Sequence, residues 1–433
     1  MSFTNFLNDQ VINIKKKGTK LLIYKIIKLF TLLPVFLVAF IFYIIILFIS
    51  PVLTVRFLSL SFTRIGAIYP LAWYLKLKKA GEFQRLKYLD FFFINNKFKH
   101  NKAWLKLWKR EVTILPFSII WKQILFINTF FKNRFKHEIL NYDSGLHDQI
   151  SAKQHPNIIK SIKEDSFKKI SLDNKKLLHF NKREIDIGEK YLSNVGIKNN
   201  QFICFHARDS AYLSHLDSSF NWSYHNFRDC NIETYSKAIK NLTNKNLFCL
   251  RMGSKVLNKL SYNNSKIIDY ANSKEQSDFL DIYLASKCYF AIYSDAGLAI
   301  IPEMFGKPMV FVNWPALNFP TYNHNSLLIP KRIYSTKNQQ LLPFRESLQL
   351  KFNSKTWEKD LKDLDLALLD NTPEEISDVS LEMEFKLKNK YKLSKEDEIL
   401  QEKFWNLINH KFVKSPSFRI GSDFLRKNKN LLN

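Results

Sequence analysis

The chain has 433 residues, of which 46% are hydrophobic and 24% are charged. This length allows two or three domains of about 150 residues each, and the composition excludes a disordered chain, which has few apolar residues and many charges. With 66 Lys and Arg against 39 Asp and Glu, the formal net charge is +27. Such a charge is typical of proteins that bind nucleic acid, an anionic membrane or an anionic substrate. AT-rich coding is an alternative source of the Lys excess, because Asn, Ile and Phe are also frequent in this chain.

The positive charge surrounds the most apolar segment of the chain. Residues 1–140 hold 23 Lys and Arg against 5 Asp and Glu, a balance of +18, whereas the remaining residues have a balance of +9. Within this part, residues 29–55 contain no charge, and they exceed the ~20 residues that a helix needs to cross the ~30 Å core of a bilayer. They also exceed the ~7 to 15 apolar residues of a cleavable signal peptide. The sequence therefore predicts a membrane-embedded segment.

The flanking charges bear on its topology. Six lysines between residues 15 and 28 precede the run, which predicts a cytoplasmic N-terminus by the positive-inside rule. Basic residues from Arg56 to Lys79 follow it, so a single crossing is not clearly favoured. Pro34 and Pro51 allow a bend into a re-entrant or interfacial anchor, which we expect in preference to a span. The domains that follow the run are then expected in the cytoplasm.

Strand-like and helix-like segments alternate directly after this run. Strands are expected at 55–62, 88–94 and 112–115, and helices at 67–79 and 102–110. Such alternation predicts a parallel sheet covered by helices. The turn Arg64-Ile-Gly66 follows the first strand, at the carboxyl edge where such sheets bind ligands.

A second α/β unit is clearer, with strands expected at 202–206, 246–250, 266–270, 288–293 and 307–312, and helices at 232–242, 277–286 and 297–305. Ser277 is an expected N-cap of the helix at 277–286. Beyond residue 351 the chain is expected to be helical, with capping signals at Thr372 and Ser394. The predicted fold class is α/β, with two α/β domains. Four regions follow: a basic N-terminus and anchor at 1–54, an N-terminal α/β domain with connector at 55–190, a C-terminal α/β domain at 191–345, and a helical region at 346–433.

Polar residues end two strands of the second unit. His206-Ala-Arg208-Asp209 follows the first of them, and a guanidinium fixed at a carboxyl edge can bind two phosphate oxygens. Arg251-Met-Gly253 follows the next strand, where a second cation would face the first and Gly253 would let the backbone approach a ligand. The alternatives are an ordering pair between Asp209 and Arg208, and an exposed arginine at the strand end.

A third polar loop, Ser294-Asp295-Ala296-Gly297, leads into a helix. The N-terminus of such a helix offers free N–H groups to a phosphate, and Glu303 on the helix is placed to accept hydrogen bonds from ribose hydroxyls. The alternative is that Asp295 caps the helix and Glu303 lies on the surface.

Together these segments carry a resemblance. FHARD, RMG, IIDY, SDFLDIYLAS, SDAGLAIIPEMFGKPMVFVN and TPEEI, in this order, resemble a bacterial family of GT-B glycosyltransferases, and RIG with NKAWLKLWKR is similar to its N-terminal half. His206-Ala-Arg208 is similar to the HxR element of fucosyltransferase-like enzymes. The resemblance implies the GT-B fold, in which two Rossmann-like domains face a cleft. It also implies a nucleotide-sugar donor on the C-terminal half and a glycan or lipid-linked acceptor on the N-terminal half.

The resemblance also implies roles for individual residues. Arg208 and Arg251 would neutralise the diphosphate, Ser294 and Gly297 would line its pocket, and Glu303 would hold the ribose. The family often has His after RIG where this chain has Ala67, so a base or acceptor contact there is in doubt.

The expected enzyme needs neither a metal nor a separate cofactor, because arginines and a helix N-terminus can stabilise the leaving diphosphate. The only DxD, Asp363-Leu-Asp365, lies in a charged stretch expected on the surface. The general base is not identified; His206, Asp209 and Asp90 are candidates.

The leading hypothesis is membrane-associated glycosyl transfer in cell-envelope polysaccharide synthesis at the bacterial inner membrane, with the catalytic domains in the cytoplasm. The expected partner is an anionic membrane, and no nucleic acid is expected. The alternatives are a nucleotide-sugar epimerase-like GT-B enzyme and a non-enzymatic basic protein that binds anionic lipid or nucleic acid. A dehydrogenase is weaker, because no GxGxxG follows a predicted strand. The four cysteines, which lack CxxC spacing, are expected to be free thiols in a reducing compartment.

Overall fold

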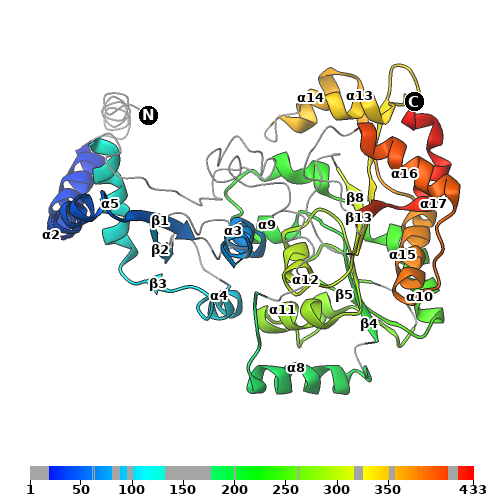
Figure 1. Ribbon diagram of the computed structural model, residues 1–433, viewed down its shortest axis with the longest axis horizontal. Coiled ribbons are helices and arrows are strands. Elements are labelled where there is room, and N and C mark those ends of the chain that lie inside the picture. The colour runs from blue at the N-terminus through cyan, green and yellow to red at the C-terminus, as the bar shows by residue number, and fades with distance from the viewer. Residues whose placement is uncertain are drawn as a thin grey trace. The chain divides into compact units, whose positions relative to one another are not determined.

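The computed structural model describes residues 19–60, 62, 64–79, 88–94, 101–131, 177–198, 201–260, 262, 264–315, 325–350, 356–407 and 418–433 (Figure 1). The chain forms two compact units. The N-terminal unit comprises Met1–Thr63, Phe83–His100 and Lys109–Asn141, and the main unit comprises Arg64–Glu82, Asn101–Trp108 and Tyr142–Asn433.

The N-terminal unit combines two apolar helices with a small parallel sheet. The helices are α2 (Thr19–Ile49) and α5 (Ser118–Phe130), and the sheet has the order β1-β2-β3, formed by Thr54–Leu60, Tyr88–Ile94 and Ile114–Leu115. The prediction of a strand at 88–94 is confirmed. The apolar run forms a helix that continues through Pro34 and ends before Pro51.

Within α2, the segment Phe30–Ile49 has the length and composition of a membrane span, with a mean hydropathy of 3.1. These properties do not by themselves place the chain in a membrane. One face of α2 is buried inside the unit, where Ala39 and Tyr43 pack with Phe57 of β1 and with Ile124 and Ile127 of α5.

The main unit is built on a seven-stranded parallel sheet, which confirms the predicted α/β class. Its order is β13-β9-β8-β7-β4-β5-β6. In chain order the strands are β4 (Phe202–His206), β5 (Phe248–Arg251), β6 (Ile267–Ile268), β7 (Ala291–Tyr293), β8 (Met309–Trp314), β9 (Ser326–Pro330) and β13 (Phe418–Ile420). β7, β8 and β9 are buried along their whole length, as expected for parallel strands with both faces covered.

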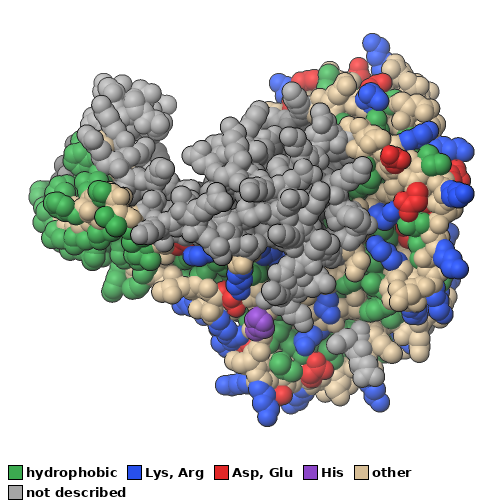
Figure 2. Space-filling view, viewed as in Figure 1, with side chains coloured by type: hydrophobic (Ala, Val, Ile, Leu, Met, Phe, Trp, Pro, Cys, Tyr) green, Lys and Arg blue, Asp and Glu red, His purple; other side chains and the backbone are tan. Residues whose placement is uncertain are grey.

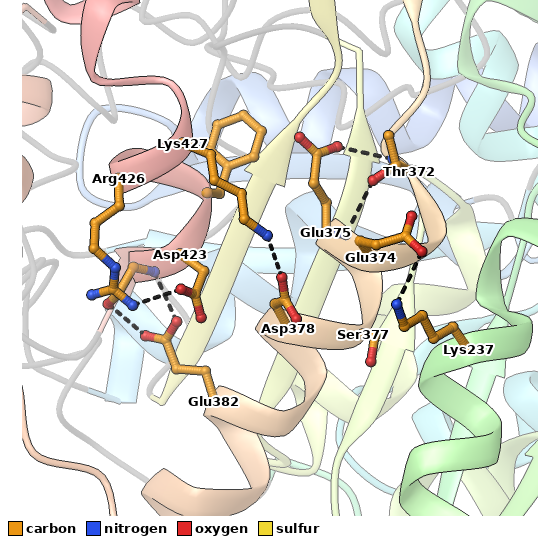
Figure 3. A network of polar contacts seen from close by, with 12 residues as sticks. Lys237, Thr372, Glu374, Glu375, Ser377, Asp378, Glu382, Asp423, Arg426 and Lys427 are labelled. Carbon is orange, nitrogen blue, oxygen red and sulfur yellow. Dashed lines mark hydrogen bonds and ion pairs between the residues drawn. The ribbon is translucent and has the colours of Figure 1, made fainter.

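Local capping explains where several helices begin. Ser277 precedes α11 (Asp278–Lys287), and its hydroxyl accepts a hydrogen bond from the Leu280 N–H at 3.3 Å. Thr372 precedes α15 (Pro373–Leu387) in a capping box with Glu375. Both caps were predicted from the sequence. Figure 3 shows the polar contacts along α15, including the pairs Lys237–Glu374 and Lys427–Asp378.

The remaining helices surround these elements. They are α3 (Tyr69–Lys79), α4 (Lys102–Trp108), α8 (Lys182–Asn194), α9 (Ala211–Leu216), α10 (Ser236–Asn244), α12 (Ile300–Met304), α13 (Phe344–Gln349), α14 (Trp357–Asp363), α16 (Lys395–Leu407) and α17 (Ser422–Lys427). Shorter 3-10 turns include η1 (Ile65–Ile68), η2 (Ser223–Arg228), η3 (Ile232–Tyr235) and η5 (Gly297–Ala299).

Two of the predictions made from the sequence are wrong in part. The C-terminal part is not only helical: β12 (Leu366–Leu369) joins an antiparallel sheet with β10 (Arg332–Ser335) and β11 (Gln340–Leu341), and β13 extends the parallel sheet beside β9. The helix predicted at 297–305 is instead the 3-10 turn η5 followed by the short α12. Pro302 has no N–H to donate within it, and Gly306, with φ of 65°, follows its end.

Candidate functional site

The order of the seven strands creates a switch point between β4 and β7. From β4 the chain proceeds to β5 and β6 on one side, whereas from β7 it proceeds to β8, β9 and β13 on the other. Ligands of open α/β sheets bind at the carboxyl ends of the strands that flank such a point. The polar loops that follow β4 and β7 therefore occupy the expected ligand-binding edge.

Hydrogen bonds join these two loops directly. The Ser294 N–H donates to the His206 carbonyl at 3.1 Å, and the Ser294 hydroxyl accepts from the Arg208 N–H at 2.8 Å. Ser294 is fully buried, and its two hydrogen bonds hold the loop of Arg208 in place. The predicted residues Arg208 and Ser294 are thus brought together.

Arg208 is a buried cation with a fixed guanidinium. Its side chain forms an ion pair with Asp229 and donates from Nη1 to the His225 carbonyl at 3.1 Å. Asp209 has a different role, because its carboxylate accepts from the N–H groups of Ala211 and Leu257 at 3.0 and 2.9 Å. Among the described residues, the partner of Arg208 is therefore Asp229, and Asp209 orders two neighbouring loops.

A second buried arginine, Arg228, lies beside Arg208. Its Nη1 is 3.6 Å from Asp295 Oδ1, and its Nη2 donates to His225 Nδ1 at 3.0 Å. Asp295 thus pairs with Arg228, and the alternative that it caps the following helix is not seen, since that turn has no side-chain cap. The sequence reading did not identify Arg228.

The pKa shifts show that burial disfavours positive charge in this cluster. Burial, and then the charge of Arg228, lowers the pKa of Arg208 to about 9. Burial followed by the charges of Arg228, Arg208 and Arg64 lowers the pKa of His225 to about 2. Positive charge is therefore costly here, and a bound anion would reduce that cost.

Lys331 adds a further cation to the same edge of the sheet. It follows β9, is 7% exposed, and its Nζ lies 2.8 Å from both the Asp229 carbonyl oxygen and Asp370 Oδ1. It was not identified from the sequence, because β9 itself was not predicted.

The residues after β5 contact His206. The Nδ1 of His206 lies 2.8 Å from the Met252 carbonyl, so Nδ1 carries the hydrogen and Nε2 keeps its lone pair. Burial lowers the pKa of His206, which keeps the ring neutral at pH 7. Gly253 has φ of 144°, and a Cβ there would lie 2.9 Å from Val256 Cγ1, so this position requires glycine.

Arg251 is 1% exposed and points toward the following loop. Its Nη1 donates to the Asn258 carbonyl and lies 3.7 Å from Asp269 Oδ1. The alternative of an exposed arginine is wrong. Its contacts are structural, and a role toward a ligand stays a prediction.

Within the main unit, the predicted residue Gly66 lies against the loop after β7, and Arg64 acts electrostatically on His225. A Cβ at Gly66 would be 2.8 Å from the Gly297 Cα, and one at Gly297 would be 3.2 Å from the Gly66 N. The two glycines therefore permit direct backbone contact between η1 and η5. This backbone contact is by itself a sufficient reason for a glycine at position 297, without any contact to a ligand.

Glu303 is 4% exposed on α12, so the alternative that it lies on the surface is wrong. Its role toward a ribose stays a prediction. Because α12 has only five residues and follows a 3-10 turn, its dipole is weaker than that of the longer helix expected from the sequence.

Aromatic rings lie next to the cations in sequence and in space. Trp222 stacks on His225 with ring centroids 6.2 Å apart, Phe220 lies 4.5 Å from Trp222, and Phe220 is 51% exposed. Rings of this kind can pack on a sugar or a nucleobase. The irregular segment 217–229 gave no periodic signal that would have identified them.

The other candidates belong to other elements of the chain. Asp90 is on β2 in the N-terminal unit. Asp363 and Asp365 are exposed, which confirms their surface position. Among the described residues, no group of three or more His, Cys, Asp or Glu is placed to hold a metal ion. All four cysteines are free thiols, and three of them are buried.

Comparisons with known proteins give similarity of structure only. No protein-family model and no curated protein matches the sequence. A glycosyl transferase family 9 protein from Veillonella parvula DSM 2008 has a TM-score of 0.44 at 10% identity, covering 78% of this chain and 98% of that chain. The E. coli ADP-heptose lps heptosyltransferase II has a TM-score of 0.36 at 12% identity, covering 72% and 98%. Staphylococcus aureus MnaA in complex with UDP has a TM-score of 0.28 at 12% identity, covering 82% and 98%. At these values the similarity carries no argument for a function, which must rest on the chain's own residues.

Proposed function

We propose that the chain is a membrane-associated GT-B glycosyltransferase that moves a sugar from a nucleotide-sugar donor to a cell-envelope glycan or lipid-linked acceptor. The observation that carries the proposal is the buried cation cluster of Arg208 and Arg228, within electrostatic reach of Arg64, at the switch point of the sheet. A diphosphate is the anion best suited to it, because guanidinium groups bind phosphate oxygens through paired hydrogen bonds.

The reaction follows from this charge distribution. The bond between the anomeric carbon and the diphosphate oxygen breaks, the acceptor hydroxyl oxygen bonds to that carbon, and the nucleoside diphosphate leaves with the bonding electrons. Negative charge therefore grows on the leaving group in the transition state, where Arg208 and Arg228 stabilise it more than in the ground state. In this proposal the arginines supply the positive charge, with no separate cofactor.

His206 is the proposed general base. Its Nε2 is the unprotonated nitrogen, and burial lowers the pKa of the ring, so it can accept the proton that the acceptor hydroxyl loses. Asp209 is less suitable, because both of its oxygens already accept backbone hydrogen bonds.

The donor contacts proposed for the remaining predicted residues follow the resemblance to GT-B enzymes. Arg251 and Gly253 would border the diphosphate, Asp295 and Gly297 would line its loop, and Glu303 would hold the ribose. The basic N-terminal third supports an anionic inner-membrane surface as partner, with the catalytic site in the cytoplasm. No nucleic acid is part of the proposal.

Donor binding is the direct test. The full-length protein in mild detergent is screened against a panel of nucleotide sugars by thermal unfolding, since a ligand that binds only the folded state raises the Tm. We expect one donor to raise the Tm of the wild type and of Arg426→Gln, but not of Arg208→Gln. Arg426 is a suitable control because it is also ion-paired, with Asp397 and Asp423 of the C-terminal region.

The product distinguishes transfer from the epimerase-like alternative. Incubation with a labelled donor and a membrane extract should place label on an acceptor, whereas an epimerase would convert the donor sugar without one. Failure of every nucleotide sugar to raise the Tm of the wild type would refute the donor assignment.

A further inference from the structure

The outer face of α5 has the composition of a buried surface. One face of this helix packs Ile124 and Ile127 into the core of the N-terminal unit. Its other face carries Ile119, Phe126 and Phe130, which are 44%, 48% and 55% exposed. Spacings of seven and four residues place these three on one stripe. The helix also carries polar residues, with Gln123 on this stripe and Lys122 beside it. Large apolar side chains on two faces are nevertheless more typical of a protein core or a membrane than of a water-exposed helix.

The exposed face of α2 has the same character. Leu37, Ile41 and Phe48 are 57%, 61% and 81% exposed. Figure 2 shows hydrophobic side chains gathered over α2 and α5. Because an exposed apolar patch of this kind marks a contact surface, the two helices present one surface to the same environment.

A hollow in this surface is lined by hydrocarbon and aromatic groups. Its volume is ≈ 410 Å³, and its walls are formed by Phe40, Tyr43, Ile44 and Leu47 of α2 and by Phe131, directly after α5. Such a lining offers water few hydrogen-bond partners, whereas a flexible acyl chain can fill it.

We infer that α5 enters the lipid bilayer together with α2, with its stripe of Ile119, Phe126 and Phe130 against lipid acyl chains. At 1.5 Å per residue, the 13 residues of α5 extend for ~20 Å, which is less than the ~30 Å hydrocarbon core. α5 therefore enters the membrane without crossing it.

The charges next to the two helices identify the occupant as an anionic bilayer. Lys25 and Lys28 belong to the first turns of α2, and Lys132, Arg134 and Lys136 follow α5 in the sequence. Basic residues next to membrane-inserted segments are attracted to anionic headgroups. This inference deepens the membrane part of the proposed function and is independent of the donor site.

The test compares the lipid contact of three exposed positions in the full-length protein. Phe126→Cys on α5, Ile41→Cys on α2 and Ile187→Cys on α8 of the main unit are labelled with the fluorophore NBD and reconstituted into phosphatidylethanolamine and phosphatidylglycerol vesicles. Ile187 is a matched control, because its exposure of 47% equals that of Phe126 within one per cent. Phe130→Cys provides a second α5 position, and the wild type gives the background from native cysteines.

Doxyl-labelled lipids quench a fluorophore only where it touches the acyl region. We expect several-fold stronger quenching at positions 126, 130 and 41 than at 187. Quenching at 41 with none at 126 and 130 would overturn the role of α5 but retain α2 as an anchor. Blue-shifted but unquenched emission at 126 would mean that protein, such as a second copy, covers α5, which also overturns the inference. No quenching at any position would overturn membrane attachment, without bearing on donor binding.

Discussion

Each of the two units of the chain holds one kind of group in an unfavourable environment. In the main unit, Phe202, Tyr293 and Phe311 are fully buried, and two arginines, Arg208 and Arg228, are buried with them. In the N-terminal unit, large apolar side chains such as Phe48 and Phe126 are exposed. Burying a charge costs free energy, and so does exposing an apolar surface to water. Each unit therefore carries a cost that a second molecule can offset: an anion at the sheet edge, and a bilayer at the helices.

The largest expected effect tests the cost of the buried charge. Arg228→Gln should lower kcat/KM for glycosyl transfer by ~100-fold, the scale of removing one group that stabilises transition-state charge. The same variant should keep or raise the Tm, because Arg228 is the leading charge that lowers the pKa of Arg208. Steady-state kinetics and thermal unfolding in detergent measure the two quantities.

Arg426→Gln provides the contrast. Its guanidinium pairs with Asp397 and Asp423, so this change should lower the Tm and leave kcat/KM unchanged. If Arg228→Gln instead lowered the Tm as Arg426→Gln does, Arg228 would be a structural residue, and its burial would not indicate an anion-binding site.

The next effect concerns the backbone contact at the site. Gly66→Ala should lower the free energy of unfolding by about 2 kcal/mol, within the range for inserting atoms into a packed region, because its Cβ would lie 2.8 Å from the Gly297 Cα. Gly297→Ala should cost less, since its nearest contact is 3.2 Å from the Gly66 N. Urea unfolding of the two variants checks the order, and equal values would show that η1 and η5 do not touch.

Much of the main sheet was predictable, because its strands are local hydrophobic runs. Phe202-Ile-Cys-Phe is fully buried, so its apolar run marks β4 without ambiguity. The caps at Ser277 and Thr372 were predictable for a similar reason, since each depends on residues three positions apart.

The features that escaped prediction depend on distant parts of the chain or on weak local signals. Arg228 lies on a 3-10 turn with no periodic pattern, and the three residues of β13 are too few to indicate a strand. The contact of Gly66 with Gly297 joins positions far apart in the sequence. α5 was not predicted either, because its apolar residues lie on both faces and give no amphipathic stripe.

A smaller effect comes from a buried carboxyl group that is not among the proposed donor contacts. Asp281 on α11 is 2% exposed, and burial raises its pKa to about 7 from the ordinary 3.8. Because the folded state holds this proton more tightly than the unfolded state, stability is greater at low pH and falls as the pH rises from about 4 to about 7. At ~1.4 kcal/mol per pKa unit, we expect about 2 to 3 kcal/mol of this loss between pH 5 and pH 8.

Asp281→Asn should remove this dependence, because an amide stays neutral and can still accept from Gln276 Nε2, which now lies 3.0 Å from Asp281 Oδ2. Urea titrations at pH 5 and pH 8 should therefore show a smaller difference for the variant than for the wild type. An unchanged difference would assign the pH dependence to other groups.

The smallest effect tests whether the two units draw their stability from different sources. Thr372→Ala removes the hydroxyl that accepts from the Glu375 N–H at 3.2 Å and should cost ~1 kcal/mol, as for other N-caps. Ser394→Ala at the start of α16, where the hydroxyl accepts from the Asp397 N–H at 3.1 Å, should cost a similar amount. Both losses are local to the main unit, so hydrogen exchange of α15 and α16 should give the same values in detergent and in vesicles.

Exchange of α5, by contrast, should slow in vesicles, because its exposed stripe would gain lipid contact there. Equal exchange of α5 in detergent and in vesicles would contradict the proposal that lipid covers the exposed apolar side chains of the N-terminal unit.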